Sequence, residues 1–272
     1  MSPGILSPPL PVYPPNNSQK NYPMNLFKKT LTLLTALVSM AVGARAATAY
    51  LIGDSTVSVY SSTYFPRMGW GQVFQNSFKS TLVVSDKALS GRSSKSFYDE
   101  GAWTPIKSAL KSGDYVFIQF GHNDEKTATN LHTDPYTTYQ QYLTIYINDA
   151  RAKGAIPILV TPVERNSWSG GVVKATHGTY PAAMRALAAS KGTPLIDLTA
   201  GSTAKYNSQG QTYTTYSIFM NLTAGQYPNY PSGNTDNTHF QQNGANIIAS
   251  LVAGAVRSSS NAQLKVLAGY LK

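Results

Sequence analysis

The tripeptide Gly53-Asp54-Ser55 puts a serine hydroxyl directly after a short apolar run at residues 50–52. This order predicts a strand, a tight turn and the start of a helix, so Ser55 would face the positive end of a helix dipole. A hydroxyl in that place can attack a carbonyl carbon if a base takes its proton. Taken alone, the tripeptide favours a plainer interpretation, in which Asp54 or Ser55 caps a helix. A nucleophile therefore needs a base, an orienting acid and oxyanion donors from elsewhere in the chain.

The base and the acid are offered together near the end of the chain, by Asp236 and His239. A carboxylate three residues before an imidazole can hold its Nδ1–H, which leaves Nε2 free to take the proton of Ser55. By themselves Asp236 and His239 could equally form a surface pair.

Two more segments offer donors for the oxyanion of a tetrahedral intermediate. Gly91 follows a predicted strand and presents a backbone N–H with no side chain in the way, and Asn123 follows another and carries an amide. Alone, Gly91 would be a turn and Asn123 a cap. Together with Ser55, Asp236 and His239, in this order and at strand ends, they predict an acyl-enzyme mechanism.

Apolar runs and helical patterns alternate along the chain and explain how these residues would be positioned. Short runs almost free of charge predict parallel strands covered on both faces, and stripes at i, i+3 and i+4 predict the helices between them. The predicted strands are 49–52, 81–84, 115–120, 156–161 and 194–198, and the helical stripes are 103–110, 139–150, 180–188 and 248–255. The pattern favours a doubly wound α/β sandwich with about five parallel strands. Two long stretches are expected to be irregular: 166–178, which is placed to line the site, and 206–238, which ends at it.

The first 46 residues are expected to be removed from the working protein. A basic segment at 25–29, an apolar one at 31–42 and the small-x-small sequence Ala44-Arg45-Ala46 have the order of a secretory signal. The uncharged run between Lys29 and Arg45 is too short for a membrane span. Residues 24–46 are therefore interpreted as a signal peptide, 1–23 as a disordered leader or a mis-assigned start before Met24, and 47–272 as one catalytic domain, secreted and free of the membrane.

Composition excludes several other classes. The chain has no cysteine, so disulfides and thiolate sites are excluded, and its four histidines form no metal-ligand motif. Removing residues 1–46 leaves 18 basic and 12 acidic side chains, a net charge of +6, scattered without a basic run. Nucleic-acid binding is a poor interpretation of that pattern. The positive charge could favour encounter with an acidic polysaccharide, or it could affect only solubility, and the sequence supports both interpretations equally.

The four motifs resemble one known family. Gly53-Asp54-Ser55, Gly91, Gly121-x-Asn123-Asp124 and Asp236-x-x-His239 match, in order, the four blocks of the SGNH (GDSL) hydrolases. Thr56 after the serine, a following Gly-Trp-Gly at 69–71, Gly-Arg-Ser at 91–93 and Phe-Gly-His-Asn-Asp at 120–124 resemble the rhamnogalacturonan acetylesterase branch. The resemblance spans about residues 48–256.

This resemblance implies a three-layer α/β/α flavodoxin-like fold in which Ser55 is the nucleophile, His239 the base and Asp236 its orienting acid. The oxyanion hole would consist of the Ser55 and Gly91 backbone N–H groups and the Asn123 side chain. The implied substrate is an acetylated pectic polysaccharide, deacetylated without a metal or other cofactor, and we expect a monomer. Alternatives are a lipase, lysophospholipase or thioesterase of the same superfamily, or a non-catalytic polysaccharide-binding protein.

Other polar residues near the motifs have expected roles as well. Arg92 could bind a uronate carboxylate and Trp168 could stack on a sugar, although core or rim roles fit them equally. Asp54 and Asp124 are expected to bond turn amides, and His122 to pack beneath Asn123. The two remaining histidines, His132 and His177, are expected at the surface.

Overall fold

The computed structural model describes residues 46–272, so the leader and signal-peptide predictions lie outside the described residues. Five parallel strands form the central sheet in the order β3-β1-β4-β5-β8. Their bounds are β1 Ala47–Gly53, β3 Leu82–Asp86, β4 Tyr115–Gln119, β5 Ile156–Val160 and β8 Leu195–Ile196. All five predicted strands are confirmed, β8 as a two-residue remnant.

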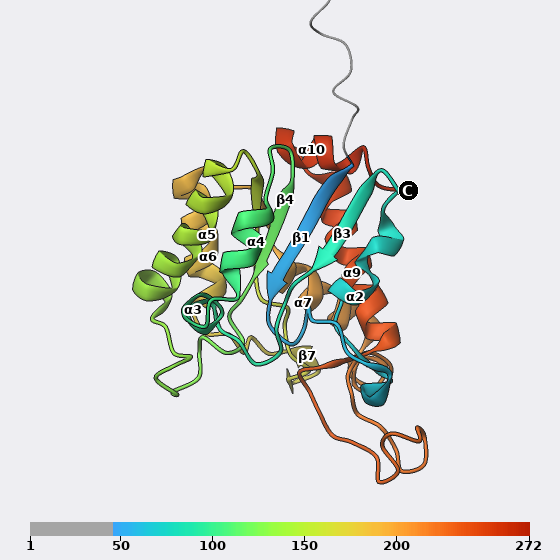
Figure 1. Cartoon of the computed structure of the whole chain (residues 1–272). Coiled ribbons are helices and arrows are strands. Elements are labelled where there is room, and N and C mark those ends of the chain that lie inside the picture. The colour runs from blue at the N-terminus through green and yellow to red at the C-terminus, as the bar shows by residue number, and fades with distance from the viewer. Residues whose placement is uncertain (1–45) are drawn as a thin grey trace, which may run out of the picture. The chain divides into compact units, whose positions relative to one another are not determined.

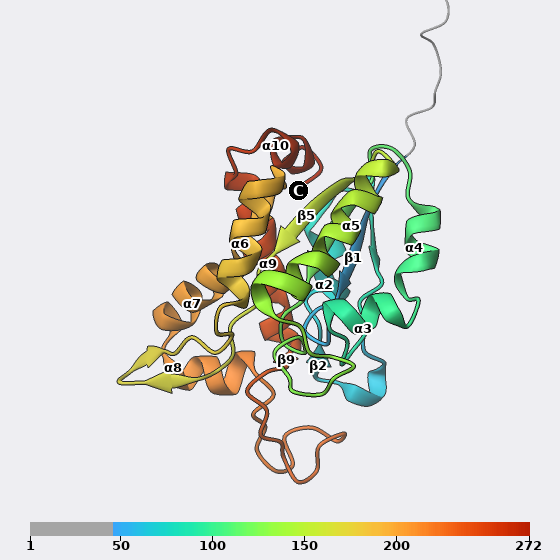
Figure 2. The ribbon, with the colours of Figure 1, turned by 90° about the vertical axis from the view of Figure 1, so that its left-hand side faces the viewer.

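Helices cover both faces of this sheet, which gives the expected three-layer α/β/α sandwich (Figures 1 and 2). One face carries α3 Ser94–Asp99, α4 Trp103–Ala109, α5 Gln140–Ala152 and α6 Tyr180–Lys191. The other carries α2 Gly71–Phe74, α7 Leu198–Gln209, α9 Gln242–Ser258 and α10 Ala262–Ala268. Among residues 46–272, no helix is both long and apolar enough to cross a membrane.

Two separate cores hold the layers together because side chains alternate along each strand. On β4, Tyr115 and Phe117 point into the core beneath α9, whereas Val116 and Ile118 point into the core beneath α5. All four are buried. This two-sided burial explains why the strands are almost uninterrupted apolar runs in the sequence.

The helix expected directly after Ser55 is absent, and that prediction is wrong. A single turn replaces it, in which the N–H groups of Val57 and Ser58 both donate to the Asp54 carbonyl at 3.2 and 3.1 Å. The residues that follow, Thr-Val-Ser-Val-Tyr-Ser-Ser-Thr, are weak helix formers, so nothing continues the turn. A 3₁₀ turn at Ser62–Tyr64 comes next.

The four helical stripes are confirmed as α4, α5, α6 and α9, but the prediction missed α3, α7 and α10. Helix α7 has no apolar stripe; the Asp197 side chain caps it by accepting from Ala200 N–H, and buried Leu198 and Tyr206 anchor it. It occupies the start of the stretch expected to be irregular. That stretch also contains α8 Gln211–Tyr213 and a π-helical turn at Thr214–Ile218. Further turns, 3₁₀ and π respectively, lie at Gln75–Ser77 and Pro135–Tyr139.

Two small antiparallel ribbons lie at the carboxyl ends of the central strands. One pairs β2 Arg67–Met68 with β9 Phe240–Gln241, and the other pairs β6 Trp168–Ser169 with β7 Val172–Val173. Figure 1 shows β7 below the tips of β1 and β4, and Figure 2 shows β2 and β9 at the same end. Segments that are distant in the sequence therefore meet at the edge where parallel sheets build their sites.

Candidate active site

The turn after β1 presents Ser55. The Asp54 Oδ1 atom accepts hydrogen bonds from the Thr56 N–H at 2.9 Å and the Thr56 hydroxyl at 2.7 Å, which confirms its predicted role in bonding a turn amide. Gly53 is required because a Cβ there would lie 2.7 Å from the Gln119 carbonyl oxygen of β4. The chain can leave the sheet this close to β4 only through a glycine, and Ser55 follows two residues later.

The structure brings Ser55, His239 and Asp236 together. The Nε2 atom of His239 lies 2.8 Å from the Ser55 hydroxyl, and its Nδ1 lies 2.7 Å from Oδ2 of Asp236. Ser55 and His239 are 184 residues apart in sequence. The arrangement allows His239 to take a proton from Ser55 while Asp236 fixes the imidazole tautomer.

Asp236 is held as a carboxylate. Its second oxygen, Oδ1, accepts the backbone N–H groups of Thr238 at 2.8 Å and His239 at 3.0 Å. Burial alone would raise the pKa of Asp236, but His239 and these two N–H groups outweigh it and lower the pKa to about 2. The acid is therefore ionised throughout the range in which an imidazole base works.

Gly91 and Asn123, the two expected oxyanion donors besides Ser55, lie on loops that contact each other. The Gly91 backbone has φ +81°, a left-handed conformation that favours glycine, and the loop leaves it exposed. Asn123 is buried, and its amide donates to the Arg92 carbonyl at 3.0 Å, which ties it to the Gly91 loop. Within residues 46–272 no acceptor takes the N–H of Ser55 or Gly91, and their part in an oxyanion hole stays a prediction.

Asp124, the residue after Asn123, links the Asn123 turn to the start of α3, which follows the Gly91 loop. It accepts from the backbone N–H of Ser94 at 3.0 Å, at the start of α3, and also from the hydroxyl groups of Ser94 and Thr133. Burial raises the pKa of Asp124 to about 7. Its predicted role in bonding a turn amide is confirmed.

Arg92 and Trp168, the two candidates for sugar contacts, differ in their surroundings. The Arg92 guanidinium pairs with Glu100 at 2.8 Å, so its charge is already offset at the protein surface. The indole N–H of Trp168 donates to the Asn166 side chain at 2.7 Å, and Asn166 in turn bonds Asn237 of the loop that carries Asp236. Trp168 thus belongs to the loop cluster around the site, and both sugar-binding roles stay predictions.

A buried polar row extends behind the nucleophile. His122 Nδ1 lies 3.3 Å from Oδ2 of Asp54, and its ring contacts that of His177 edge to face at 4.5 Å between centroids. Burial lowers the pKa of His122 to about 4, so it is neutral at neutral pH. The predicted surface position is confirmed for exposed His132 but is wrong for His177, which is buried because it bonds both Glu125 and the Val163 carbonyl.

Sequence reasoning missed Tyr60, which contacts the nucleophile turn, and Arg67, which contacts Tyr60. The Tyr60 hydroxyl donates to the Ser55 carbonyl at 2.8 Å, and the Arg67 guanidinium donates to the Tyr60 hydroxyl at 3.1 Å. Burial raises the pKa of Tyr60, so its hydroxyl stays protonated and can donate. Arg67 stands two residues before the Gly-Trp-Gly segment that carried part of the family resemblance, and this was its one available signal.

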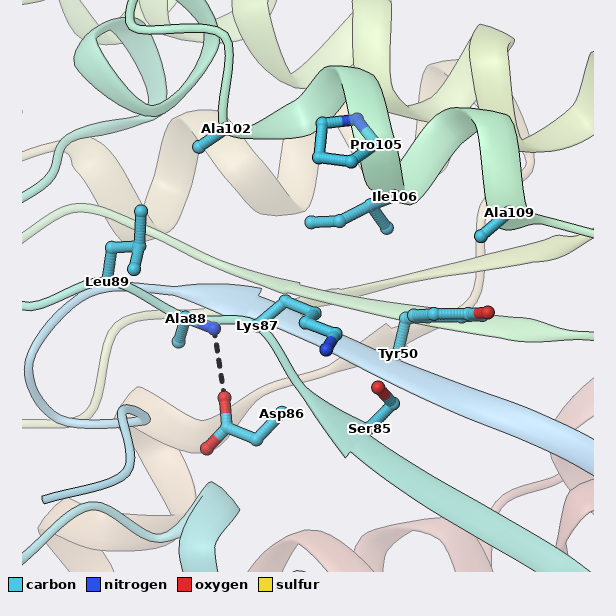
Figure 3. A pocket seen from close by; sticks show the side chains of 10 residues that line it. All are labelled: Tyr50, Ser85, Asp86, Lys87, Ala88, Leu89, Ala102, Pro105, Ile106 and Ala109. Atoms are coloured by element: carbon cyan, nitrogen blue, oxygen red, sulfur yellow. Dashed lines mark hydrogen bonds between the residues drawn. The ribbon is translucent and has the colours of Figure 1, made fainter. Parts of the chain in front are cut away.

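A cavity of about 610 Å³ lies beside the site, between α4 and the β1–β3 edge of the sheet. Figure 3 shows Ala102, Pro105, Ile106 and Ala109 on the α4 side and Tyr50, Ser85 and the segment 86–89 opposite them. Ser55, Gly91, Asn123 and His239 do not line this cavity. It is therefore not a binding pocket that opens onto the nucleophile.

Asp86 at this cavity is half-buried, and the pKa of its carboxyl group is raised. Its Oδ1 accepts the Ala88 N–H at 2.9 Å (Figure 3), whereas its Oδ2 is buried without a hydrogen-bond partner. Burial raises its pKa from 3.8 to about 7. The folded chain thus keeps Asp86 protonated at pH values where the unfolded chain ionises it, so this group's contribution to stability is lost as the pH rises from about 4 to about 7.

Asp86→Asn is therefore expected to raise the free energy of unfolding by about 2 kcal/mol near pH 8 and to change it little near pH 4. The asparagine keeps the acceptor for Ala88 but cannot ionise. Denaturant unfolding at both pH values measures the difference. Exposed Asp134→Asn serves as the matched control, and an Asp86→Asn curve parallel to wild type across this range would contradict the assignment.

Comparison with known proteins agrees with this geometry. The profile of the GDSL-like lipase/acylhydrolase family matches residues 51–246, which include Ser55, Gly91, Asn123, Asp236 and His239. The chain is 42% identical to the Bacillus subtilis rhamnogalacturonan acetylesterase RhgT over 208 residues, 76% of this chain and 88% of the relative. It is 39% identical to a probable rhamnogalacturonan acetylesterase of the same organism, YesY, over 76% of this chain and 91% of that one.

A solved structure agrees as well. The crystal structure of the Bacillus subtilis protein YxiM superposes with a TM-score of 0.69 at 28% identity and covers 80% of this chain. This chain spans only 58% of that longer one, so the similarity concerns the α/β domain. The sequence match, the fold and the strand-end serine lead to the same assignment: the chain belongs to the GDSL-like lipase/acylhydrolase family and is a serine esterase that resembles the rhamnogalacturonan acetylesterases.

Proposed function

We propose that this protein is a secreted carbohydrate esterase that removes acetyl groups from rhamnogalacturonan. The observation that carries the proposal is the hydrogen-bonded line from the Ser55 hydroxyl through His239 to Asp236, at 2.8 and 2.7 Å. The substrate class is supported by the names of relatives that share 42% and 39% identity with this chain. Secretion rests on the signal-like segment 24–46. We expect the secreted protein to have the mass of a chain that begins at Ala47.

The proposed mechanism begins with attack of the Ser55 oxygen on the acetyl carbonyl carbon, while Nε2 of His239 accepts the serine proton. The oxyanion that forms is stabilised by the N–H groups of Ser55 and Gly91 and by the Asn123 amide. His239 then gives its proton to the leaving sugar hydroxyl, and an acetyl-enzyme remains. Water deprotonated by His239 attacks that ester, and acetate leaves as Ser55 regains its proton.

A long-chain lipase is the second function that the family permits, and the surroundings of Ser55 favour the acetylesterase. A lipase needs an apolar groove for the acyl chain that reaches the nucleophile. The Tyr60 hydroxyl bonds the Ser55 carbonyl and the His239 imidazole bonds the Ser55 hydroxyl, and the cavity beneath α4 does not include Ser55. Polar surroundings suit a two-carbon acyl group on a sugar better than a fatty acid.

Acetate release from acetylated rhamnogalacturonan, compared with acetylated xylan and acetylated homogalacturonan, tests the proposal. The highest kcat/KM is expected on rhamnogalacturonan. A panel of p-nitrophenyl esters of increasing chain length provides the second measurement, on which acetate should be the best acyl group. Strong preference for long chains, or for xylan, would overturn the proposed function.

Asn123→Ala is expected to lower kcat by about 10²- to 10³-fold with little change in KM, because the amide would bind the oxyanion only as it forms. Steady-state kinetics on p-nitrophenyl acetate measures this. The exposed Asn130→Ala is the matched control. Asn123 would not be an oxyanion donor if Asn123→Ala raised KM by the same factor by which it lowered kcat, or if kcat fell by less than about threefold.

A further inference from the structure

Arg67 lies on a strand that pairs with β9, the strand that begins directly after the base His239. On the β2–β9 ribbon, Met68 is opposite Phe240, the residue directly after His239, and Arg67 is opposite Gln241. The guanidinium carbon lies 4.6 Å over the Tyr60 ring, and Nη2 donates to the Tyr60 hydroxyl at 3.1 Å. Because that hydroxyl bonds the Ser55 carbonyl, one phenol group separates the cation from the nucleophile's backbone.

This cation has no anionic partner within residues 46–272. The other arginines near the loops are paired, Arg92 with Glu100 and Arg165 with Glu125, whereas no carboxylate lies within ion-pair distance of Arg67. Its Nε is moreover buried without a hydrogen-bond acceptor. A substrate cannot reach the buried Nε, but Arg67 as a whole is half-buried, and a carboxylate that meets the guanidinium group from solvent would offset its unpaired charge.

The surface around Arg67 has features that suit a sugar ring. The irregular segment 222–234 packs on residues 62–65: Asn229 donates to the carbonyls of Ser62 and Phe65 at 3.0 and 2.9 Å, and Tyr230 donates to that of Tyr64. The Tyr64 ring stays 50% exposed and that of Phe65 39%. The Tyr64 ring contacts the Tyr60 ring at 5.8 Å between centroids, so an exposed aromatic residue and the Arg67 cation share Tyr60 as a neighbour. An aromatic residue and a planar cation together can stack on a sugar and bind a carboxylate.

We propose that Arg67 binds the carboxylate of a uronic acid residue in the substrate and so selects acidic over neutral acetylated polysaccharides. The inference rests on the proposed function and deepens it, because rhamnogalacturonan contains a uronic acid in every repeat. Arg92, the arginine favoured by sequence alone, is the weaker anchor because Glu100 already neutralises it. Arg67 acts here as a specificity-determining residue and takes no part in bond making.

The test compares Arg67→Gln, Arg67→Lys and wild type on two polymers: acetylated rhamnogalacturonan, and the same polymer with its carboxyl groups reduced to primary alcohols. Wild type is expected to prefer the acidic polymer. Arg67→Gln should lower the acidic-to-reduced ratio of kcat/KM by about tenfold to a hundredfold, the size of a lost charge-assisted hydrogen bond. Arg67→Lys should give an intermediate ratio because lysine keeps the charge but loses the planar fork.

Lys265→Gln is the control, since it removes one positive charge from exposed α10. If Arg67→Gln lowers kcat/KM by the same factor on both polymers, Arg67 only positions Tyr60 and the inference is wrong. The inference is also wrong if the wild-type enzyme does not prefer the acidic polymer, or if added NaCl does not weaken that preference. Both measurements use the wild-type protein, so they do not depend on whether a variant folds. Hydrolysis of p-nitrophenyl acetate with no acetate release from either polymer would instead refute the proposed function.

Discussion

Ser55→Ala is expected to lower kcat for ester hydrolysis by at least about 10⁴-fold, to the level that binding and the oxyanion donors provide without a nucleophile. The hydroxyl that lies 2.8 Å from His239 Nε2 is the atom that would form the acetyl-enzyme. Initial rates on p-nitrophenyl acetate, and mass spectrometry of enzyme quenched during turnover, measure the loss and the missing acetyl adduct.

A matched control for this variant is Ser61→Ala, which removes an exposed hydroxyl from the segment that follows the turn. It should keep wild-type turnover. The double variant Ser55→Ala with His239→Ala should be no slower than either single variant, because a base without a nucleophile contributes nothing. Near-native turnover in Ser55→Ala would refute the mechanism, whereas additive losses would show that Ser55 and His239 act independently.

Asp236→Asn is expected to lower kcat by about 10⁴-fold with little effect on KM. The carboxylate Oδ2 accepts the Nδ1–H of His239 at 2.7 Å, whereas an asparagine amide can present its own N–H there and so favour the wrong tautomer. Nε2 would then carry a proton and could not accept one from Ser55. The control is Asp99→Asn at an exposed site, and retention of more than about a tenth of wild-type kcat in Asp236→Asn would contradict the role.

The same carboxylate makes a pH-dependent contribution to stability whose sign is opposite to that of Asp86. Because the pKa of Asp236 is lowered from 3.8 to about 2 in the folded chain, its contribution is complete above about pH 4 and is lost as the pH falls towards 2. Asp236→Asn should therefore be less stable than wild type near pH 6, and the gap should narrow in acid. Denaturant unfolding of both proteins would show whether the variant's kinetic loss is accompanied by misfolding.

The five strands could be predicted because burial on both faces leaves a signal that is local in sequence. Val116 and Ile118 face one core and Tyr115 and Phe117 the other, so the whole run must be apolar. Helix α7 left no such signal, since its cap and two buried residues stabilise it without an apolar stripe. The helix expected after Ser55 failed because weak helix formers follow the turn, and because tertiary contacts, here Gly53 against Gln119 and Tyr60 against Ser55, hold the chain on another path.

Sequence by itself determined which residue types stand at the strand ends, and hence the chemistry that they could perform. Order along the chain was sufficient for this, because the carboxyl ends of parallel strands meet at one edge whatever the loops do. Tertiary structure alone decided how charges are paired. His177 is buried against His122 and Glu125, and Arg92 pairs with Glu100. Arg67 lies over the Tyr60 ring, and no carboxylate of residues 46–272 pairs with it. Pairing depends on distances between side chains from separate loops, which the order of residues along the chain does not give.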